Sequence, residues 1–293
     1  MPYKIIEKKQ LRNSGMLYVM VLNAPLIAKK ACAGNFILIR IDEKGERIPL
    51  TIADYDRETG TITIVYQVVG KTTKQLSHLN AGAEILDVVG PLGNAIHLEK
   101  FDHPVVIIGG GVGIAPCYPQ AMELKKVGNK IISILGARTK DLLFWKDRMA
   151  AVSDEVIITT NDGTEGNEGF VTAPLKEILK KEKISLVITI GPLIMMKNVA
   201  LLTSGIEGLP KVKTFVSLNT IMVDGTGMCG GCRFSTLDGD IYFACVDGPD
   251  VDGHIVDFDN LLKRAGRFVD QEKNSLERYD PECKALEKLN NGS

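Results

Sequence analysis

The stretch "PVVIIGGGVGIAP", from Pro104 to Pro116, joins a continuous apolar run to a glycine-rich turn. Strands that are buried on both faces of a parallel sheet have such uninterrupted apolar runs. The turn carries Gly111-x-Gly113-x-x-Pro116, and a proline suits the first turn of a following helix. Glycines let the backbone approach a pyrophosphate, which then lies at the positive end of the helix. The stretch therefore predicts a strand, a nucleotide-binding turn and a helix, although a tight turn of this kind can also bind nothing.

The residues after this turn alternate between strand and helix patterns. The strand candidates are "KIISILGAR", "EVIITTNDG" and "LVITIGP", and the helix candidates are "YPQAMELKKVG", "DLLFWKDRMAAV" and "APLKEILKKEK". This rhythm predicts a doubly wound parallel nucleotide-binding domain over residues 101–222. Ligands bind at the carboxyl edge of such sheets, where Gly191 and Pro192 would lie. Arg138 stands where an acidic residue would hold the ribose of NAD, so this motif alone leaves both NADH and NADPH open.

The residues before the turn have the pattern of an antiparallel sheet. Short β-branched segments, "NFILIRI", "RIPLTIA", "TITIVYQVV" and "AEILDVVGPLG", predict a small β-barrel over residues 1–100. Arg47 and Thr51 offer a cation and a hydroxyl to a flavin. Gly70, Thr72 and Thr73 offer a turn with N–H groups and hydroxyls to a pyrophosphate. A solvated arginine and a plain hairpin turn would explain these two segments equally well.

A cysteine-rich loop opens the remaining segment, residues 223–293. Its spacing is Asp224-x4-Cys229-x2-Cys232-x12-Cys245, which is the plant-type [2Fe–2S] spacing with a carboxylate in the first place. Zinc is the alternative metal, because it also binds Cys and Asp, and inert thiols are a third possibility. His254 is the one histidine nearby, and a surface or hydrogen-bonding role is favoured over a ligand role. We therefore expect a small C-terminal subdomain that a metal stabilises.

Composition excludes several classes of protein. The chain has 293 residues, with 35 basic and 36 acidic side chains, so it lacks the positive excess that a nucleic-acid binder needs. Its first residues have no apolar core of a signal peptide, and no window reaches the length of a membrane span. We expect a soluble cytoplasmic protein with no membrane association. Six cysteines are too few for a disulfide scaffold in a chain of this length.

The order of these motifs carries a family resemblance. A barrel, the turn Gly-Gly-Gly-x-Gly-x-Ala-Pro and a C-terminal cluster loop resemble the ferredoxin–NADP reductase superfamily. Over its full length the chain looks like the branch of dihydroorotate dehydrogenase electron-transfer subunits. Within that branch, "ERIPLTIAD", "GARTKDLLFW" and "VDGTGMCGGCR" are most similar to small subunits of flavin-based electron-bifurcating NADH-dependent ferredoxin:NADP+ oxidoreductases.

The resemblance implies three cofactor sites. It places FAD on the barrel, NAD(H) on the α/β domain and a [2Fe–2S] cluster on the C-terminal loop. It also implies a heterodimer with a larger flavin and [4Fe–4S] subunit, through which ferredoxin and NADPH are handled. The residues implied are Arg47, Pro49, Leu50, Thr51, Gly70, Lys71, Thr72 and Thr73 for FAD; Gly111, Val112, Gly113, Ala115, Pro116, Arg138, Gly191 and Pro192 for NAD(H); and Asp224, Cys229, Cys232 and Cys245 for the cluster.

The chain departs from the superfamily pattern in three places. Arg47 is four residues before Thr51 rather than three, and Ile190 replaces the cysteine that often precedes Gly-Pro. Asp224 replaces the first cluster cysteine, which favours the bifurcating relatives. We expect an electron-transfer subunit in which the cofactors carry the chemistry and no side chain is a catalytic nucleophile or base. The alternatives are an electron-transfer subunit of dihydroorotate dehydrogenase and a redox or nucleotide sensor without turnover.

Overall fold

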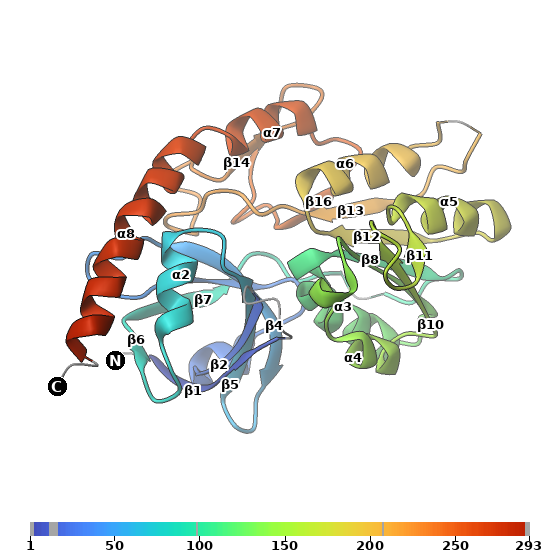
Figure 1. Cartoon of the computed structure of the whole chain (residues 1–293). Coiled ribbons are helices and arrows are strands. Elements are labelled where there is room, and N and C mark those ends of the chain that lie inside the picture. Colours follow the sequence, from blue (N-terminus) through green and yellow to red (C-terminus); the bar gives the residue numbers. More distant parts are fainter. Residues whose placement is uncertain (1–2, 12–16, 98, 207, 291–293) are drawn as a thin grey trace.

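The computed structural model of the chain describes residues 3–11, 17–97, 99–206 and 208–290, with side chains described as far as Tyr279. Within these ranges it contains two seven-stranded sheets and one two-stranded hairpin (Figure 1).

The first sheet is a nearly closed antiparallel barrel, as predicted. Its strand order is β6-β1-β2-β5-β4-β3-β7, and two short helices accompany it. The segment "AEILDVVGPLG", predicted as a single strand, is divided at Leu86, whose N–H donates to the Ile41 carbonyl. This bend lets one half pair with β1 and the other with β3, which brings the two edges of the sheet together. The elements are β1 (Tyr3–Gln10), β2 (Leu17–Asn23), α1 (Pro25–Lys30), β3 (Phe36–Arg40), β4 (Ile48–Asp56), β5 (Thr61–Gln67), α2 (Lys71–His78), β6 (Glu84–Ile85) and β7 (Asp87–Leu92).

The second sheet confirms the predicted doubly wound domain. Its order is β11-β10-β9-β8-β12-β13-β16, and every pairing is parallel except that of β13 with β16. Helices α3 and α4 cover the face toward the barrel, and α5 and α6 cover the other face (Figure 1). The elements are β8 (Val105–Gly110), α3 (Ile114–Lys126), β9 (Ile131–Ala137), α4 (Lys146–Ala151), β10 (Glu155–Thr160), β11 (Asn167–Glu168), α5 (Thr172–Lys181), β12 (Leu186–Ile190), α6 (Leu193–Leu202), β13 (Thr214–Ser217) and β16 (Asp250–Asp252).

The helix predicted over "DLLFWKDRMAAV" is shorter than expected. A single 3₁₀ turn covers Lys140–Leu142, and α4 begins only at Lys146. Trp145 between them has a φ of 53°, in the left-handed region, which interrupts a right-handed helix. Its ring packs edge-on against Tyr118 and Phe144, with centroids 5.7 and 5.9 Å away, so aromatic packing holds this bend.

The C-terminal segment folds over both larger sheets. It holds the hairpin β14 (Arg233–Ser235) and β15 (Ile241–Phe243), then α7 (Phe258–Ala265) and α8 (Val269–Asn290). Its buried core combines Phe234 and Cys245 with Phe36 of the barrel and Val216 of β13. Strand β16 belongs to this segment yet extends the second sheet, so the boundary proposed after residue 222 cuts between elements that share a sheet. None of the helices in the described ranges has the length and apolar character to cross a bilayer.

Candidate functional site

The glycine-rich turn lies where the strand order reverses. Strand β8 pairs with β9 on one side and β12 on the other, so the turns that follow β8 and β12 meet at the carboxyl edge of the sheet. A Cβ on Gly113 would overlap the Ile190 carbonyl oxygen and lie 2.6 Å from its carbon. A Cβ on Gly191 would lie 2.7 Å from the Met195 methyl and 3.0 Å from the Gly110 oxygen. These glycines are therefore needed for packing between the two turns.

Gly111 differs from Gly113 and Gly191, because no neighbouring atoms pack against its backbone where a Cβ would lie. Its φ is 56°, and nothing lies within 4 Å of the place where a Cβ would be. Val112 and Pro116 are half-buried beside it, whereas Ala115 is buried. Arg138, directly after β9, and Pro192, at the start of α6, lie along the same edge of the sheet. These residues, which the sequence predicted to bind NAD(H), lie along one edge of the sheet, with open space beside Gly111.

The two flavin-associated segments of the barrel meet through a contact that was not predicted. The Thr72 hydroxyl donates to the Glu46 carboxylate at 3.1 Å, which joins the start of α2 to the residue before Arg47. Pro49, Leu50 and Thr51 are half-buried, although β4 lies between β3 and β5 within the sheet. Arg47 is exposed at the entrance to this strand. A partly open strand in the interior of a sheet is a surface that a planar ligand could cover.

Residues 70–73 form a helix start rather than the predicted turn. Gly70 precedes α2, and the Thr73 hydroxyl accepts hydrogen bonds from the Val69 and Gly70 N–H groups, both at 3.0 Å. This side chain caps the incoming chain and allows the helix to begin at Lys71. No atom lies within 4 Å of a Cβ position on Gly70, so the backbone there is open. The first turn of a helix presents unpaired N–H groups, which suits a phosphate.

An ion pair connects the barrel to the nucleotide-binding domain. Asp54, at the end of "ERIPLTIAD", pairs with Arg148 of α4. The Arg148 guanidinium lies over the rings of Tyr118 and Trp145, 4.2 and 4.3 Å from their centroids. Burial acts to lower the pKa of Arg148, but its interactions with Asp54 and Tyr118 together raise that pKa above its ordinary value. Sequence reasoning missed this contact because Arg148 lies 94 residues after Asp54 and belongs to none of the predicted cofactor segments.

The cysteine loop brings two of its three thiols together. Cys232 and Cys245 are buried, and their sulfurs are 3.2 Å apart. Two thiolates on one tetrahedral metal, each with a bond of about 2.3 Å, lie about 3.7 Å apart, so a small movement would suit one iron. Burial raises the pKa of Cys245 to about 12 from its ordinary value of 9.0, and the Cys232 thiol adds to the effect. Cys245 therefore stays protonated at neutral pH unless a metal displaces its proton.

The other two predicted ligands lie at the exposed side of the loop. Cys229 is exposed, and its sulfur accepts a hydrogen bond from the Gly231 N–H at 3.4 Å. The carboxylate of Asp224 accepts the N–H groups of Thr226 and Cys229, at 2.9 and 2.6 Å. The first of these hydrogen bonds does most to lower the pKa of Asp224, so the side chain is an anion. The Asp224 side chain therefore spans the loop to the backbone of Cys229, five residues later in the sequence.

These four side chains fit a two-iron cluster in donor chemistry and in spacing. Within the described part of the chain, no three His, Cys, Asp or Glu side chains surround one point where a single ion would lie. A [2Fe–2S] cluster does not need such a point, because two irons share the four ligands. Gly225 has a φ of 72°, and a Cβ there would lie 2.6 Å from the Leu92 side chain, so the loop packs closely on the barrel.

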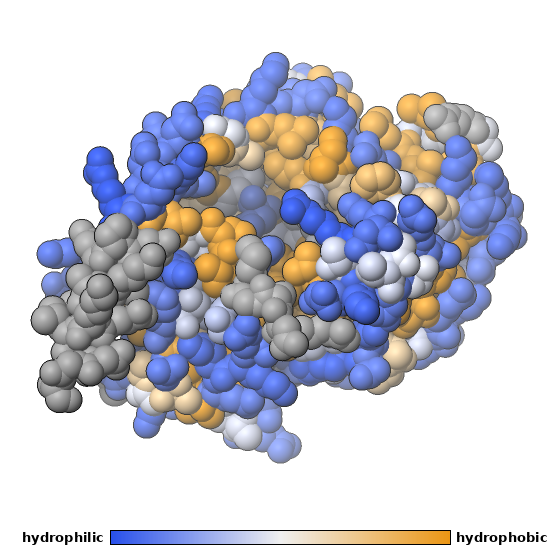
Figure 2. Space-filling model, viewed as in Figure 1, coloured by the Kyte–Doolittle hydropathy of each residue, from blue (hydrophilic) through white to orange (hydrophobic). Residues whose placement is uncertain are grey.

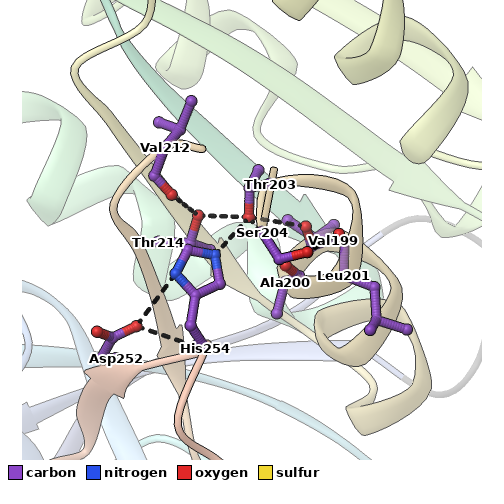
Figure 3. A network of polar contacts seen from close by, with 9 residues as sticks. All are labelled: Val199, Ala200, Leu201, Thr203, Ser204, Val212, Thr214, Asp252 and His254. Atoms are coloured by element: carbon purple, nitrogen blue, oxygen red, sulfur yellow. Dashed lines mark hydrogen bonds and ion pairs between the residues drawn. The ribbon is translucent and has the colours of Figure 1, made fainter. Parts of the chain in front are cut away.

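His254 has the hydrogen-bonding role that the sequence favoured. Its Nε2 lies 3.1 Å from the Thr203 hydroxyl, and its Nδ1 lies 3.6 Å from Asp252 (Figure 3). The Thr214 hydroxyl donates to the Thr203 oxygen at 2.6 Å, so the network ties α6, β13 and β16 together. Burial is the main cause that lowers the pKa of His254. The residue stabilises the join between the second sheet and the C-terminal segment.

Known proteins resemble both the cysteine loop and most of the rest of the chain. Residues 219–257, which include all four predicted cluster ligands, match the model of the iron–sulfur cluster binding domain of dihydroorotate dehydrogenase B. A dihydroorotate dehydrogenase B (NAD+) electron transfer subunit homolog from Thermotoga maritima is 49% identical over 88% of this chain and 89% of its own. The electron transfer subunit from Fusobacterium nucleatum is 33% identical over 79% of this chain and 89% of its own.

A solved structure is similar to this chain over almost its whole length. It comes from a study of flavin-based electron bifurcation in the NADH-dependent reduced ferredoxin–NADP oxidoreductase. It matches with a TM-score of 0.87 and 44% identity, and the match covers 95% of this chain and 98% of that one. The similarity therefore includes the barrel, the parallel sheet and the C-terminal segment.

Proposed function

This chain belongs to the family of dihydroorotate dehydrogenase B electron-transfer subunits and their homologues, and we propose that it is the electron-transfer subunit of a flavin-based electron-bifurcating, NADH-dependent ferredoxin:NADP+ oxidoreductase. The observation that carries this proposal is the match over 95% of the chain, at a TM-score of 0.87, to the structure from the NADH-dependent reduced ferredoxin–NADP oxidoreductase.

Three cofactors are proposed for three surfaces of the chain. FAD is assigned to β4 and the start of α2, NAD(H) to the turns after β8 and β12, and a [2Fe–2S] cluster to the loop from Asp224 to Cys245. When bound, the flavin supplies exchange between hydride and single-electron transfer, and the cluster supplies single-electron transfer. The two proposed nucleotide surfaces belong to domains that the Asp54–Arg148 pair and the α3 packing connect.

The tasks of the chain's own residues are binding, orientation and exclusion of water. The open backbone at Gly111 admits the dinucleotide, and the packing of Gly113 on Ile190 fixes the distance between the two turns. Arg138 is available to the phosphate or adenine of the nucleotide. Pro49, Leu50 and Thr51 offer an apolar surface and one hydroxyl to the flavin ring. No acid, base or nucleophile is assigned, because hydride and electron transfer need none.

A partner subunit is part of the proposal. The relatives are named electron transfer subunits, which implies a larger assembly. Around the cysteine loop the described side chains leave apolar groups exposed: Met228 at 89%, Val223 at 47% and Val246 at 40%. Such residues beside a cluster suit a docked protein that takes electrons directly. We propose a larger flavin and [4Fe–4S] subunit there, forming a heterodimer and handling ferredoxin and NADPH.

The second candidate is an electron-transfer subunit of dihydroorotate dehydrogenase itself. The names of the Thermotoga and Fusobacterium relatives favour it. The carboxylate at position 224 favours the bifurcating enzyme, because the dihydroorotate dehydrogenase subunits that the chain resembles carry four cysteines. The two candidates share the cofactors on this chain and differ in the partner.

Purification of the native complex separates the two candidates. The chain would be isolated without oxygen from its own cells, and the associated protein identified by mass spectrometry together with its flavin and iron content. A large subunit with flavin and iron–sulfur clusters, and NADPH oxidation that depends on ferredoxin and NAD+, supports bifurcation. A partner that oxidises dihydroorotate would replace the first proposal with the second.

A further inference from the structure

The C-terminal helix α8 lies along helix α2 of the barrel. Near one end of the contact the Tyr279 ring stacks on His78, with centroids 6.2 Å apart. Toward the other end, Gln271 and Lys71 line the same cavity. The start of α2 therefore faces an early residue of α8 and its end faces a later one, so the two helices run parallel. Figure 1 shows α8 running down the outer side of the barrel past α2.

The face that α8 turns toward this contact is polar. A helix packed against a domain normally presents an apolar stripe at positions i, i+3, i+4, i+7 and i+8. In α8 those positions carry amide, hydroxyl, guanidinium and phenol groups. The described part of α8 is also hydrophilic in Figure 2. Five side chains of this face line a cavity of about 450 Å³ together with Lys71: Gln271, Asn274, Ser275, Arg278 and Tyr279.

The composition of the cavity suits an anion with hydrogen-bonding groups. Its lining contains two cations, Lys71 and Arg278, and no carboxylate. Its volume is within the range of about 300 to 1,000 Å³ that small-molecule sites occupy. Lys71 is the first residue of α2 and follows Gly70, whose open backbone is proposed to face the diphosphate of FAD. Through Lys71 the cavity therefore adjoins the start of α2, which is part of the proposed flavin surface.

We propose that α8 forms the outer wall of the flavin site and binds the adenosine-diphosphate half of FAD. Lys71 and Arg278 would pair with the diphosphate, a contact in which a guanidinium can bind two oxygens at once. Gln271, Asn274 and Ser275 offer donors and acceptors to the adenosine. This inference rests on the proposed function, since it assumes that the barrel binds FAD.

Flavin binding to variants of the full chain tests the inference. Arg278→Gln keeps a polar side chain and removes the cation. Lys273→Gln is the matched control, because Lys273 is on the same helix, is 72% exposed, lies 4.0 Å from Glu277 and is absent from the cavity lining. Flavin-free protein would be titrated with FAD and with riboflavin, which lacks both phosphates and the adenosine, by flavin fluorescence.

The proposal predicts a pattern across ligands and variants. Arg278→Gln should weaken FAD binding about tenfold, equivalent to about 1.4 kcal/mol, and leave riboflavin binding within about twofold. Lys273→Gln should match the unmodified chain for both ligands. Equal FAD affinities for the two variants would overturn the role of α8, and so would an equal loss of FAD and riboflavin binding in Arg278→Gln. If the unmodified chain binds neither flavin, the proposed function itself fails.

Discussion

The same substitution at two glycines of one turn is expected to affect mainly stability at Gly113 and mainly NADH binding at Gly111. At Gly113 a Cβ would overlap the Ile190 carbonyl, which is backbone and cannot turn aside. Forced overpacking costs up to about 3 kcal/mol, so Gly113→Ala should lower the thermal midpoint by about 6 to 12 °C. At Gly111 the Cβ would enter open space and the φ of 56° adds strain of about 1 kcal/mol, so the expected change is about 2 to 4 °C.

For NADH binding by folded protein, we expect the larger loss of affinity at Gly111 rather than at Gly113. A methyl group on Gly111 enters the space proposed for the diphosphate, so it should raise the dissociation constant for NADH at least tenfold in protein that is still folded. Calorimetric titration with NADH below both thermal midpoints measures this, and differential scanning calorimetry measures the stability. Gly113→Ala with unchanged stability would refute the described packing of the turns. Gly111→Ala with unchanged NADH affinity would refute the assignment of the dinucleotide to this turn.

Three further predictions concern single side chains. Asp224→Cys should retain a cluster with a shifted reduction potential, because a thiolate is softer than a carboxylate; an unchanged potential in a redox titration followed by electron paramagnetic resonance would show that Asp224 is no ligand. Arg148→Ala should lose about 1 kcal/mol of stability, since the pair with Asp54 is partly exposed and the ring contacts add a modest amount; a double-mutant cycle with Asp54→Asn that gives no coupling would contradict this. Burial raises the pKa of Asp250 from 3.8 to about 6, so the folded state holds this proton more tightly than the unfolded state does. The free energy of unfolding should therefore fall by about 3 kcal/mol between pH 4 and pH 6 and then level off, and Asp250→Asn should abolish that loss. Urea unfolding that gives the same pH profile for this variant and for the unmodified chain would count against it.

The sequence was sufficient for features whose signal is local. The apolar run from Val105 to Gly110 and the glycines after it predicted a buried strand and turn, and the spacing from Asp224 to Cys245 predicted one loop with four potential ligands. Hydrophobic pattern and glycine position both depend on neighbours in the chain. The barrel and the doubly wound sheet followed for the same reason.

Contacts between distant segments could not be predicted in this way. The helical pattern of "DLLFWKDRMAAV" gave no sign that Trp145 would be held in a left-handed conformation by the ring of Tyr118. The hydrogen bond from the Thr72 hydroxyl to Glu46, 26 residues away in the chain, has no local signal in the sequence. The polar face of α8 suits a ligand only because that helix lies beside Lys71, and this position could not be predicted from the local sequence. Each of these depends on tertiary packing that overrides local preference.

We propose that electrons pass between NADH, a flavin and an iron–sulfur cluster on this one chain. The most direct test is an anaerobic titration of the purified chain with NADH, followed by visible absorbance and electron paramagnetic resonance. We expect flavin and cluster bands that bleach together on addition of NADH, with the resonance of a reduced [2Fe–2S] centre. A colourless protein that contains zinc, or a coloured one that NADH leaves oxidised, would contradict it.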